Sequence, residues 1–143
     1  MPPPTLVAEA TRRSAVLWVS SPTVAPTLVW HVWHDAAAYV VCGGREQALP
    51  PLGPCATVAV RSRAGALVVT WEAAVTRVEP GTPQWEAVVP LLTAERLNAP
   101  AVQALPALWA ADSAVLRLRP AQVGAAEDGQ AWTTSRGAPV VTS

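Results

Sequence analysis

One long alternation of residue types constrains this chain more than any other feature. Residues Ala66 to Val78 form a run rich in Val and Thr in which apolar and polar side chains largely alternate. Successive side chains of a β-strand point to opposite faces, so this pattern predicts a strand with one face on a core. The residues expected to face inward are Leu67, Val69, Trp71, Ala73 and Val75, and those expected to face outward are Thr70, Glu72 and Thr76.

A second Val- and Thr-containing run, Ala56 to Ser62, precedes this strand. Only Arg63-Ala64-Gly65 separates the two runs, and Gly65 tolerates the positive φ that a tight turn needs. The two runs are therefore predicted to form an antiparallel hairpin.

Three shorter apolar runs lie upstream, at Ala15–Ser20, Thr27–His34 and Tyr39–Cys42. Their Val and Trp content and their bounding turn residues predict strands, with a turn at His34–Ala37. The segment Arg45–Pro54 holds three prolines and two leucines, which predicts a loop that packs on the rest of the domain.

After the long strand, the period changes to that of a helix. Thr82 can cap a helix whose first residue is Pro83, and Pro90 is expected to kink it. The residues at helical spacing are Trp85, Val88, Val89, Leu92 and Arg96.

A second short helix is expected from Ala101 to Ala111, interrupted by Pro106. The next run, Ser113–Arg119, alternates like a strand. The residues expected on its inner face are Ala114, Leu116 and Leu118.

These elements predict a mainly β (α+β) domain over residues 1–120, a small closed antiparallel barrel with one or two edge helices. The 143 residues are 51% hydrophobic and 14% charged, a balance typical of one packed domain. Residues 121–143 are expected to form a C-terminal tail, and two alternatives stay open: a mobile tail, as its small and polar composition indicates, or a tail that packs on a partner subunit.

Composition excludes several functions. All ten basic residues are Arg, so no mechanism that needs a lysine amine is open to this chain. A net charge of +0 without a basic run argues against nucleic-acid binding.

The uncharged stretch from Ser14 to His34 is interrupted by Pro22 and Pro26, which favours strands over a membrane span. Because no secretory signal is evident and Cys42 and Cys55 match no zinc or redox motif, we expect a cytoplasmic protein with free thiols.

The layout resembles that of a known family. The residues that carry the resemblance are Leu28 to Trp33, Tyr39 to Val41, a Gly-containing loop, Val58 to Arg63, Val68 to Val78, and a helix opening Pro83-Gln84-Trp85. In this order, over Ala15 to Pro120, they resemble the FMN-binding split barrel of the pyridoxamine-phosphate-oxidase-like proteins. The resemblance implies a homodimer that binds FMN, a deazaflavin or haem between its subunits.

The resemblance also implies where a cofactor would lie. In flavin-binding members the strand similar to Tyr39–Cys42 leads into a loop whose Ser and Lys hold the phosphate. Here that loop begins Gly43-Gly44, and Arg45 and Gln47 are the nearest substitutes for those residues. The glycines would let a ligand approach the backbone N–H groups closely.

Arg61, Ser62 and Arg63 are the candidate cofactor-binding residues of the hairpin, with the two arginines on either side of Ser62. On a strand both guanidinium groups would leave the same face and could fork onto phosphate oxygens as one clamp. One of Trp30 and Trp33 must face away from the core and could stack on a flat ligand. The alternatives without a binding function are that the arginines are solvated at the tip of a hairpin and that the tryptophans are part of the core.

Three functions stay open: an FMN- or deazaflavin-dependent oxidoreductase, a non-catalytic cofactor-binding or structural protein, and a carrier of another flat cofactor, including haem through His31 or His34. The two histidines point to opposite faces of a strand, so they do not form a metal site together. No residue pattern identifies a catalytic group.

Overall fold

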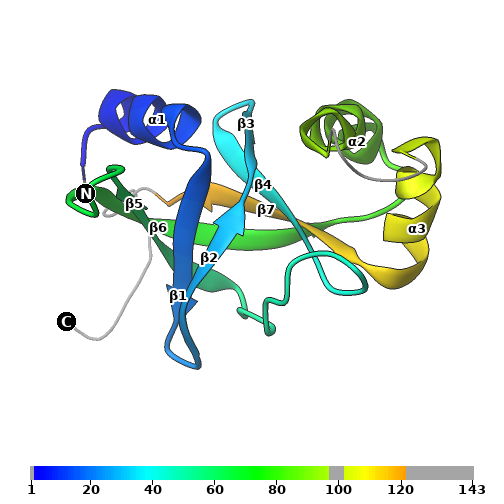
Figure 1. Cartoon of the computed structure of the whole chain (residues 1–143), viewed down its shortest axis with the longest axis horizontal. Helices are drawn as coiled ribbons and strands as arrows, with labels where there is room; N and C mark the ends of the chain where they lie inside the picture. Colours follow the sequence, from blue (N-terminus) through cyan, green and yellow to red (C-terminus); the bar gives the residue numbers. More distant parts are fainter. Residues whose placement is uncertain (1, 97–101, 122–143) are drawn as a thin grey trace.

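Seven antiparallel strands form one curled sheet in the computed structural model, which describes residues 2–96 and 102–121 (Figure 1). The strands are β1 (Val16–Ser21), β2 (Val24–Trp30), β3 (Val32–His34), β4 (Ala37–Cys42), β5 (Cys55–Arg61), β6 (Leu67–Val78) and β7 (Ala114–Pro120). The expected mainly β split barrel is confirmed. The expected tail lies outside the described residues from residue 122 onward.

The order of the strands explains the curl. The sheet runs β2-β1-β5-β6-β7-β4-β3, so its two edge strands are consecutive in the chain and are joined by His31 alone. The edges can meet in this way only if the sheet bends back on itself. The side-chain amide of Gln47 bridges the two ends of the sheet, because its Nε2 donates to Trp30 O of β2 at 3.2 Å and to Val41 O of β4 at 3.0 Å.

The single strand expected at Thr27–His34 is therefore two strands. β2 pairs with β1, whereas β3 pairs with β4, and the backbone changes partner at His31. The apolar run continues through the break, which is why the sequence pattern does not show it.

Two clusters of buried residues lie on the two faces of the sheet. The inner cluster consists of Val7, Leu17, Val19, Val24, Val29, Ala38, Val40, Leu52, Ala56, Val58, Val60, Val69, Trp71, Ala73 and Leu118. The outer cluster consists of Ala37, Tyr39, Val41, Val78, Trp85, Val88, Val89, Leu92, Leu105, Trp109 and Val115. All six residues of β4 are buried, since alternate residues enter the two clusters.

Two helices cover the outer cluster. α2 (Pro83–Glu95) begins as expected, with Thr82 Oγ1 accepting a hydrogen bond from the Trp85 N–H at 3.2 Å. α3 (Leu105–Asp112) follows a short 3₁₀ turn, η1 (Val102–Ala104). Pro106 stands in the first turn of α3 and does not interrupt it, because a proline there has no helical N–H bond to lose.

The first helix, α1 (Pro4–Arg13), was not expected. Only Val7 and Thr11 are buried in it, too few apolar residues to show a helical period. Its place is set by tertiary contacts instead. The Trp71 Nε1–H donates to Thr11 Oγ1 at 3.0 Å, and Val7 belongs to the inner cluster.

The inward face predicted for β6 is correct except at its start. Val69, Trp71 and Ala73 are buried, but Leu67 is exposed. The register of β5 and β6 shifts between Val60 and Arg61, so that Leu67 lies opposite Arg61. This bulge turns Leu67 to the outer face. In β7 Leu118 faces inward as expected, while Val115 on the other face is equally buried under the helices.

Candidate functional site

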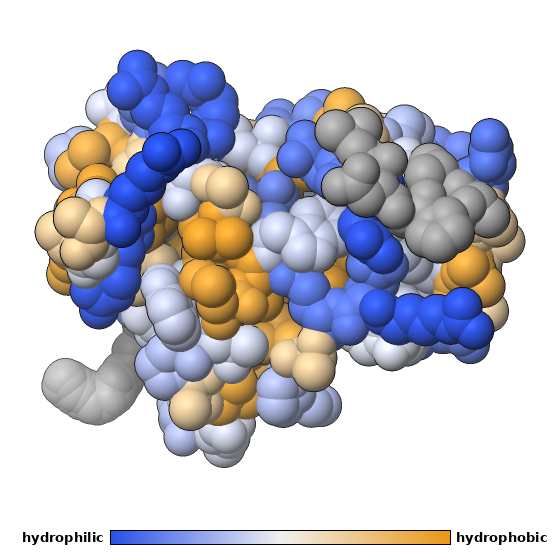
Figure 2. All heavy atoms as spheres, viewed as in Figure 1, coloured by the Kyte–Doolittle hydropathy of each residue, from blue (hydrophilic) through white to orange (hydrophobic). Residues whose placement is uncertain are grey.

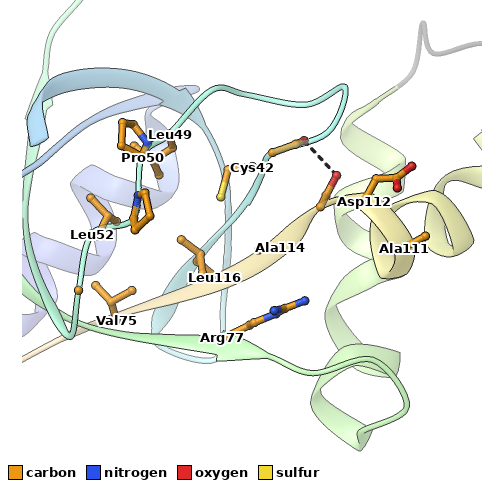
Figure 3. A pocket seen from close by; sticks show the side chains of 14 residues that line it. Cys42, Leu49, Pro50, Leu52, Val75, Arg77, Ala111, Asp112, Ala114 and Leu116 are labelled. Atoms are coloured by element: carbon orange, nitrogen blue, oxygen red, sulfur yellow. Dashed lines mark hydrogen bonds between the residues drawn. The ribbon is translucent and has the colours of Figure 1, made fainter.

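A cavity of about 610 Å³ lies between the inner face of the sheet and the loop that follows β4 (Figure 3). We call it the loop pocket. Its floor consists of Cys42, Val75, Arg77, Ala114 and Leu116, its roof of Leu49, Pro50, Pro51, Leu52 and Gly53, and its rim of Gly43, Ala111, Asp112 and Ser113. β5 begins at Cys55, opposite Ala74, so the end of β6 has no β5 neighbour and the loop covers it instead.

The polar groups of the loop pocket are few. The Arg77 side chain is about half exposed, and its Nε lies 3.9 Å from Glu79 Oε2. Burial raises the pKa of the Cys42 thiol, while the positive charge of Arg77 partly opposes this rise. The thiol is therefore protonated at neutral pH, and Arg77 is the cation of the cavity.

Gly43 and Gly44 serve the packing of the loop. Both have positive φ, and a Cβ on Gly44 would lie 2.9 Å from Asp112 O and from Ser113 Oγ. The Ser113 hydroxyl donates to Gly43 O at 3.0 Å, a bond drawn in Figure 3. Of the two glycines, Gly43 lines the loop pocket, while Gly44 allows the close approach to the start of β7.

The side chains of Glu46 and Gln47, later in the loop, point into the protein. The Glu46 side chain is 4% exposed, its Oε1 lies 3.1 Å from Arg96 Nε, and its Oε2 accepts from Trp109 Nε1 at 3.0 Å. Gln47 is engaged through both side-chain atoms, since its Oε1 accepts from the Trp30 N–H and its Nε2 donates to two carbonyls. Of the two side chains proposed to replace the phosphate-binding Ser and Lys, Arg45 is exposed and Gln47 is half-buried.

The hairpin arginines lie at the other end of β6. β5 ends at Arg61, and Arg63 stands in the turn, where Ser62 Oγ accepts from the Ala66 N–H. Arg61 Nη1 donates to Gly65 O at 3.1 Å. Leu67, which lies opposite Arg61, and Arg77, which lines the loop pocket, are ten residues apart in β6, about 33 Å along the strand. Within one chain the structure does not bring the two groups of proposed ligands together.

Arg61 instead lines a smaller hollow of about 250 Å³ on the outer face of the sheet. Its other lining residues are Trp18, Ser20, Pro26 and Ala59.

Trp30 and Trp33, the two candidates for stacking on a ligand, lie on opposite faces of the sheet. Trp33 packs on the inner cluster, edge-on to Trp71 with ring centroids 6.3 Å apart. Trp30 packs on the outer cluster. Both are half-buried, and neither lines the loop pocket.

His31 is buried, with Nε2 2.8 Å from Thr11 O, in the structural role expected for it. Burial lowers its pKa, an effect that the Thr11 carbonyl partly opposes. His34 is half-buried beside the ring of Tyr39. Among residues 2–96 and 102–121, no three His, Cys, Asp or Glu side chains gather as a metal site would require. In the same part of the chain, no helix has the length and apolar character needed to cross a membrane.

Sequence reasoning did not single out Arg77 or Cys42 as site residues, although one signal was present. Arg77 continues the odd-numbered inner face of β6 past Val75, so the strand carries a charge on the side that faces the core. A charged residue at an inward position near a strand end indicates a polar cavity. Cys42 carries no comparable signal, because β4 is apolar throughout.

Comparison with known proteins gives structural matches alone. Neither a protein-family model nor a curated protein matches the sequence. A candidate pyridoxamine 5′-phosphate oxidase from Listeria innocua is similar, with a TM-score of 0.56, 12% identity, and coverage of 83% of this chain and 94% of that one. HutZ, the haem storage protein of Vibrio cholerae, is similar with a TM-score of 0.54 and 17% identity, and the match covers 81% of this chain and 88% of HutZ. An FAD-binding protein from Mesorhizobium loti is similar with a TM-score of 0.50 and 13% identity, over 80% of this chain and 86% of that one.

Proposed function

Since the chain has the split-barrel fold of the pyridoxamine-phosphate-oxidase-like proteins, we propose that it binds a flavin-type cofactor, FMN or a deazaflavin, in the loop pocket and acts as an oxidoreductase on a small molecule. The observation that supports this proposal most directly is the combination of apolar walls and one cation in a cavity of suitable size. A volume of about 610 Å³ lies within the range of small-molecule sites.

The lining residues suit a flat ring with one anionic group. Leu49, Pro50 and Leu116 offer rigid apolar surface to a ring system, and Figure 3 shows Arg77 at the edge of the same space. A guanidinium can hold phosphate oxygens through paired donors. The Asp112 carboxylate at the rim would repel an anion, which favours a phosphate on the Arg77 side of the cavity.

A bound flavin would supply the hydride chemistry itself. The chain would bind the phosphate through Arg77, hold the ring between the prolines and the sheet, and exclude water with its leucines. Cys42 would form a neutral part of the floor, because its raised pKa keeps the thiol from acting as a nucleophile at neutral pH.

A second candidate, a non-catalytic carrier of the same kind of cofactor, has one observation in its favour. The ionisable residues that line the loop pocket are Cys42, Arg77 and Asp112, and neither the thiol nor the guanidinium can act as a base near pH 7. HutZ, which has a similar fold, is a haem storage protein. In this chain His31 is 7% exposed and its Nε2 is hydrogen-bonded to Thr11 O, so a haem carrier would depend on the half-buried His34.

We also propose that the chain forms a cytoplasmic homodimer through the outer face of β1, β2 and β5. No described helix covers that face, and its side chains include exposed Val16 and Leu28 and half-buried Trp18. Figure 2 shows apolar residues gathered in the middle of the molecule, where Figure 1 places β1 and β2. Exposed apolar patches of this kind mark interfaces. Cys42 and Cys55 are both free thiols, as suits a reducing compartment.

The test begins with the visible spectrum of the purified protein and a titration with FMN, FAD and a deazaflavin. We expect Arg77→Gln to weaken FMN binding about tenfold, since it removes one charge-assisted contact. The double variant Arg61→Ala/Arg63→Ala serves as the matched comparison at the other end of β6. Unchanged affinity in Arg77→Gln together with loss in the double variant would reject the loop pocket in favour of the hairpin arginines.

Reduction of the bound cofactor by NADH or NADPH separates the two candidate functions. An oxidoreductase should show turnover with an electron acceptor, whereas a carrier should bind the cofactor without turnover. Absence of binding by the wild type would reject both.

A further inference from the structure

A second cavity, of about 240 Å³, lies at the opposite end of β7 from the loop pocket. We call it the helix pocket, and its walls are Pro4, Val7 and Ala8 of α1, Trp33 of β3, Ala36 of the following turn, and Arg119 and Pro120 of β7. Figure 1 shows α1 beside the β3–β4 hairpin, where these segments meet. Ala114 lines the loop pocket and Pro120 the helix pocket, so about 20 Å of strand separates the two cavities.

The walls of the helix pocket are apolar with one exception. The exception is Arg119, which is exposed and is the only charged residue among the described lining residues. None of the described residues that line this cavity carries a carboxylate. A small apolar cavity with a single cation at its edge suits a ligand with an apolar body and one negative charge.

Trp33 gives the cavity a pre-formed aromatic wall. Its ring packs edge-on against Trp71 with an interplanar angle of 86°, and Trp71 is itself held by the bond to Thr11. Because the ring is fixed before any ligand arrives, little side-chain entropy would be lost on binding. An aromatic or short aliphatic group can pack on such a surface.

The turn that completes the wall is strained. Asp35 and Ala36 have φ of 48° and 59°, in the left-handed region that a residue with a Cβ rarely adopts. The usual residues of this two-residue turn are Asn and Gly. Strained backbone persists where the surrounding structure requires it and gathers at ligand sites. Here it holds the Ala36 methyl group in the cavity wall.

We propose that the helix pocket binds a small aryl or short-chain carboxylate of about ten heavy atoms, with its carboxylate on Arg119 and its apolar group on Trp33. This site is independent of the proposed cofactor function, because the two cavities share no lining residue.

The experiment uses the full chain and two probes of the same size and shape, the anionic phenylacetate and the neutral phenylacetamide. Isothermal titration should give a Kd of about 1 mM for phenylacetate, as expected for a ligand of this size, and about tenfold weaker binding of the amide. Arg119→Gln should weaken phenylacetate binding about tenfold and leave phenylacetamide binding unchanged. Arg63→Gln, at the exposed hairpin turn, is the matched control and should bind like the wild type.

A second variant tests the location of the site. Ala8→Leu adds a side chain to the wall contributed by α1, and it should abolish binding of both probes while a thermal melt confirms that the protein stays folded. Three results would overturn the proposal: no binding by the wild type at about 10 mM, equal affinity for the acid and the amide, or unchanged phenylacetate binding in Arg119→Gln. If Ala8→Leu does not fold, the Arg119→Gln result decides alone.

Discussion

The two halves of the sheet differ in how many of their faces are covered. Around β4 and β7, the inner cluster lies on one face and α2 and α3 lie on the other, so all six residues of β4 are buried. In β5 buried and accessible residues alternate, because no described helix packs on its outer face. The same fold thus contains a three-layered half and a two-layered half, and only the second leaves an apolar face open to a partner.

The cavities lie at different places in the two halves. The loop pocket opens where β6 runs past the end of β5 into the three-layered half, and the helix pocket lies where α1 meets the β3–β4 turn. The open face of the two-layered half bears the hollow of about 250 Å³ beside Arg61, which residues of β1, β2 and β5 line. We propose that small ligands bind at the ends of the barrel and that a second protomer packs on its open face.

The largest effect should come from the face that both halves share. Trp71 is 1% exposed in the two-layered half, and Trp71→Ala should lower the free energy of unfolding by about 3–5 kcal/mol through the cavity it leaves and the lost bond to Thr11. Urea unfolding measures this change. A loss below about 1 kcal/mol would mean that the inner face of this half is loosely packed, contrary to the comparison.

The outer faces should respond differently to the same substitution. Leu92 of α2 is fully buried on the outer cluster, and Leu92→Ala should cost about 2–4 kcal/mol. Leu28, 49% exposed on the outer face of β2, is the matched residue, and Leu28→Ala should change the free energy of unfolding of the protomer by no more than about 0.5 kcal/mol.

Leu28 also tests the dimer. Light scattering should show that Leu28→Glu shifts the wild-type dimer toward monomer, because it places a charge at the proposed contact. A monomeric wild type, or a variant dimer as stable as the wild type, would remove the open face as an interface.

A smaller, pH-dependent effect is expected at the junction of the halves, where His31 joins β2 to β3. Burial lowers the pKa of His31 below its ordinary value of 6.5. Below pH 6.5 the imidazole is therefore protonated in the unfolded chain while it is still neutral in the native protein. Stability supplied by neutral His31 is thus fully present above pH 6.5 and is lost as the pH falls toward the native pKa. Glu95, whose negative charge favours protonation, and the Thr11 carbonyl limit the size of this loss.

The variant His31→Gln isolates this contribution from other titrating groups. The wild type should be the more stable protein at pH 7.5, and its advantage should shrink at pH 5 when both are unfolded in urea. A constant difference between the two proteins across this range would contradict a neutral buried imidazole.

Local patterns were sufficient for the elements whose burial follows a regular period. The β5–β6 hairpin and α2 with its Thr82 cap were predicted from alternation, helical spacing and a capping residue. α1 was missed because two buried residues set no period, and the break at His31 was missed because a change of strand partner leaves an apolar run apolar. Both features depend on contacts between distant segments.

The candidate site was predictable only in part for the same reason. Gly43 follows an apolar strand and does line a cavity, but the side chains of Glu46 and Gln47 turn inward to partners 50 and 17 residues away in sequence, Arg96 and Trp30. Nothing in their local sequence indicates those partners. The distance between Arg61 and the loop likewise follows from the length and pairing of β6, which the spacing of the arginines does not show.

The smallest effect concerns the turns at the ends of the two halves, where the same substitution should have opposite signs. Ala36→Gly, in the β3–β4 turn, removes a Cβ from a left-handed residue and should raise the free energy of unfolding by about 0.5–1 kcal/mol, because relief of about 1–2 kcal/mol of strain exceeds the added entropy of the unfolded chain. Ala64→Gly, in the exposed β5–β6 turn, relieves no such strain, since Ala64 has negative φ, and should lower the free energy of unfolding by about 0.5 kcal/mol. Paired thermal and urea unfolding of the two variants measures both changes. Loss of stability in both would show that Ala36 carries no strain, and the wall of the helix pocket would then need no special backbone to hold it.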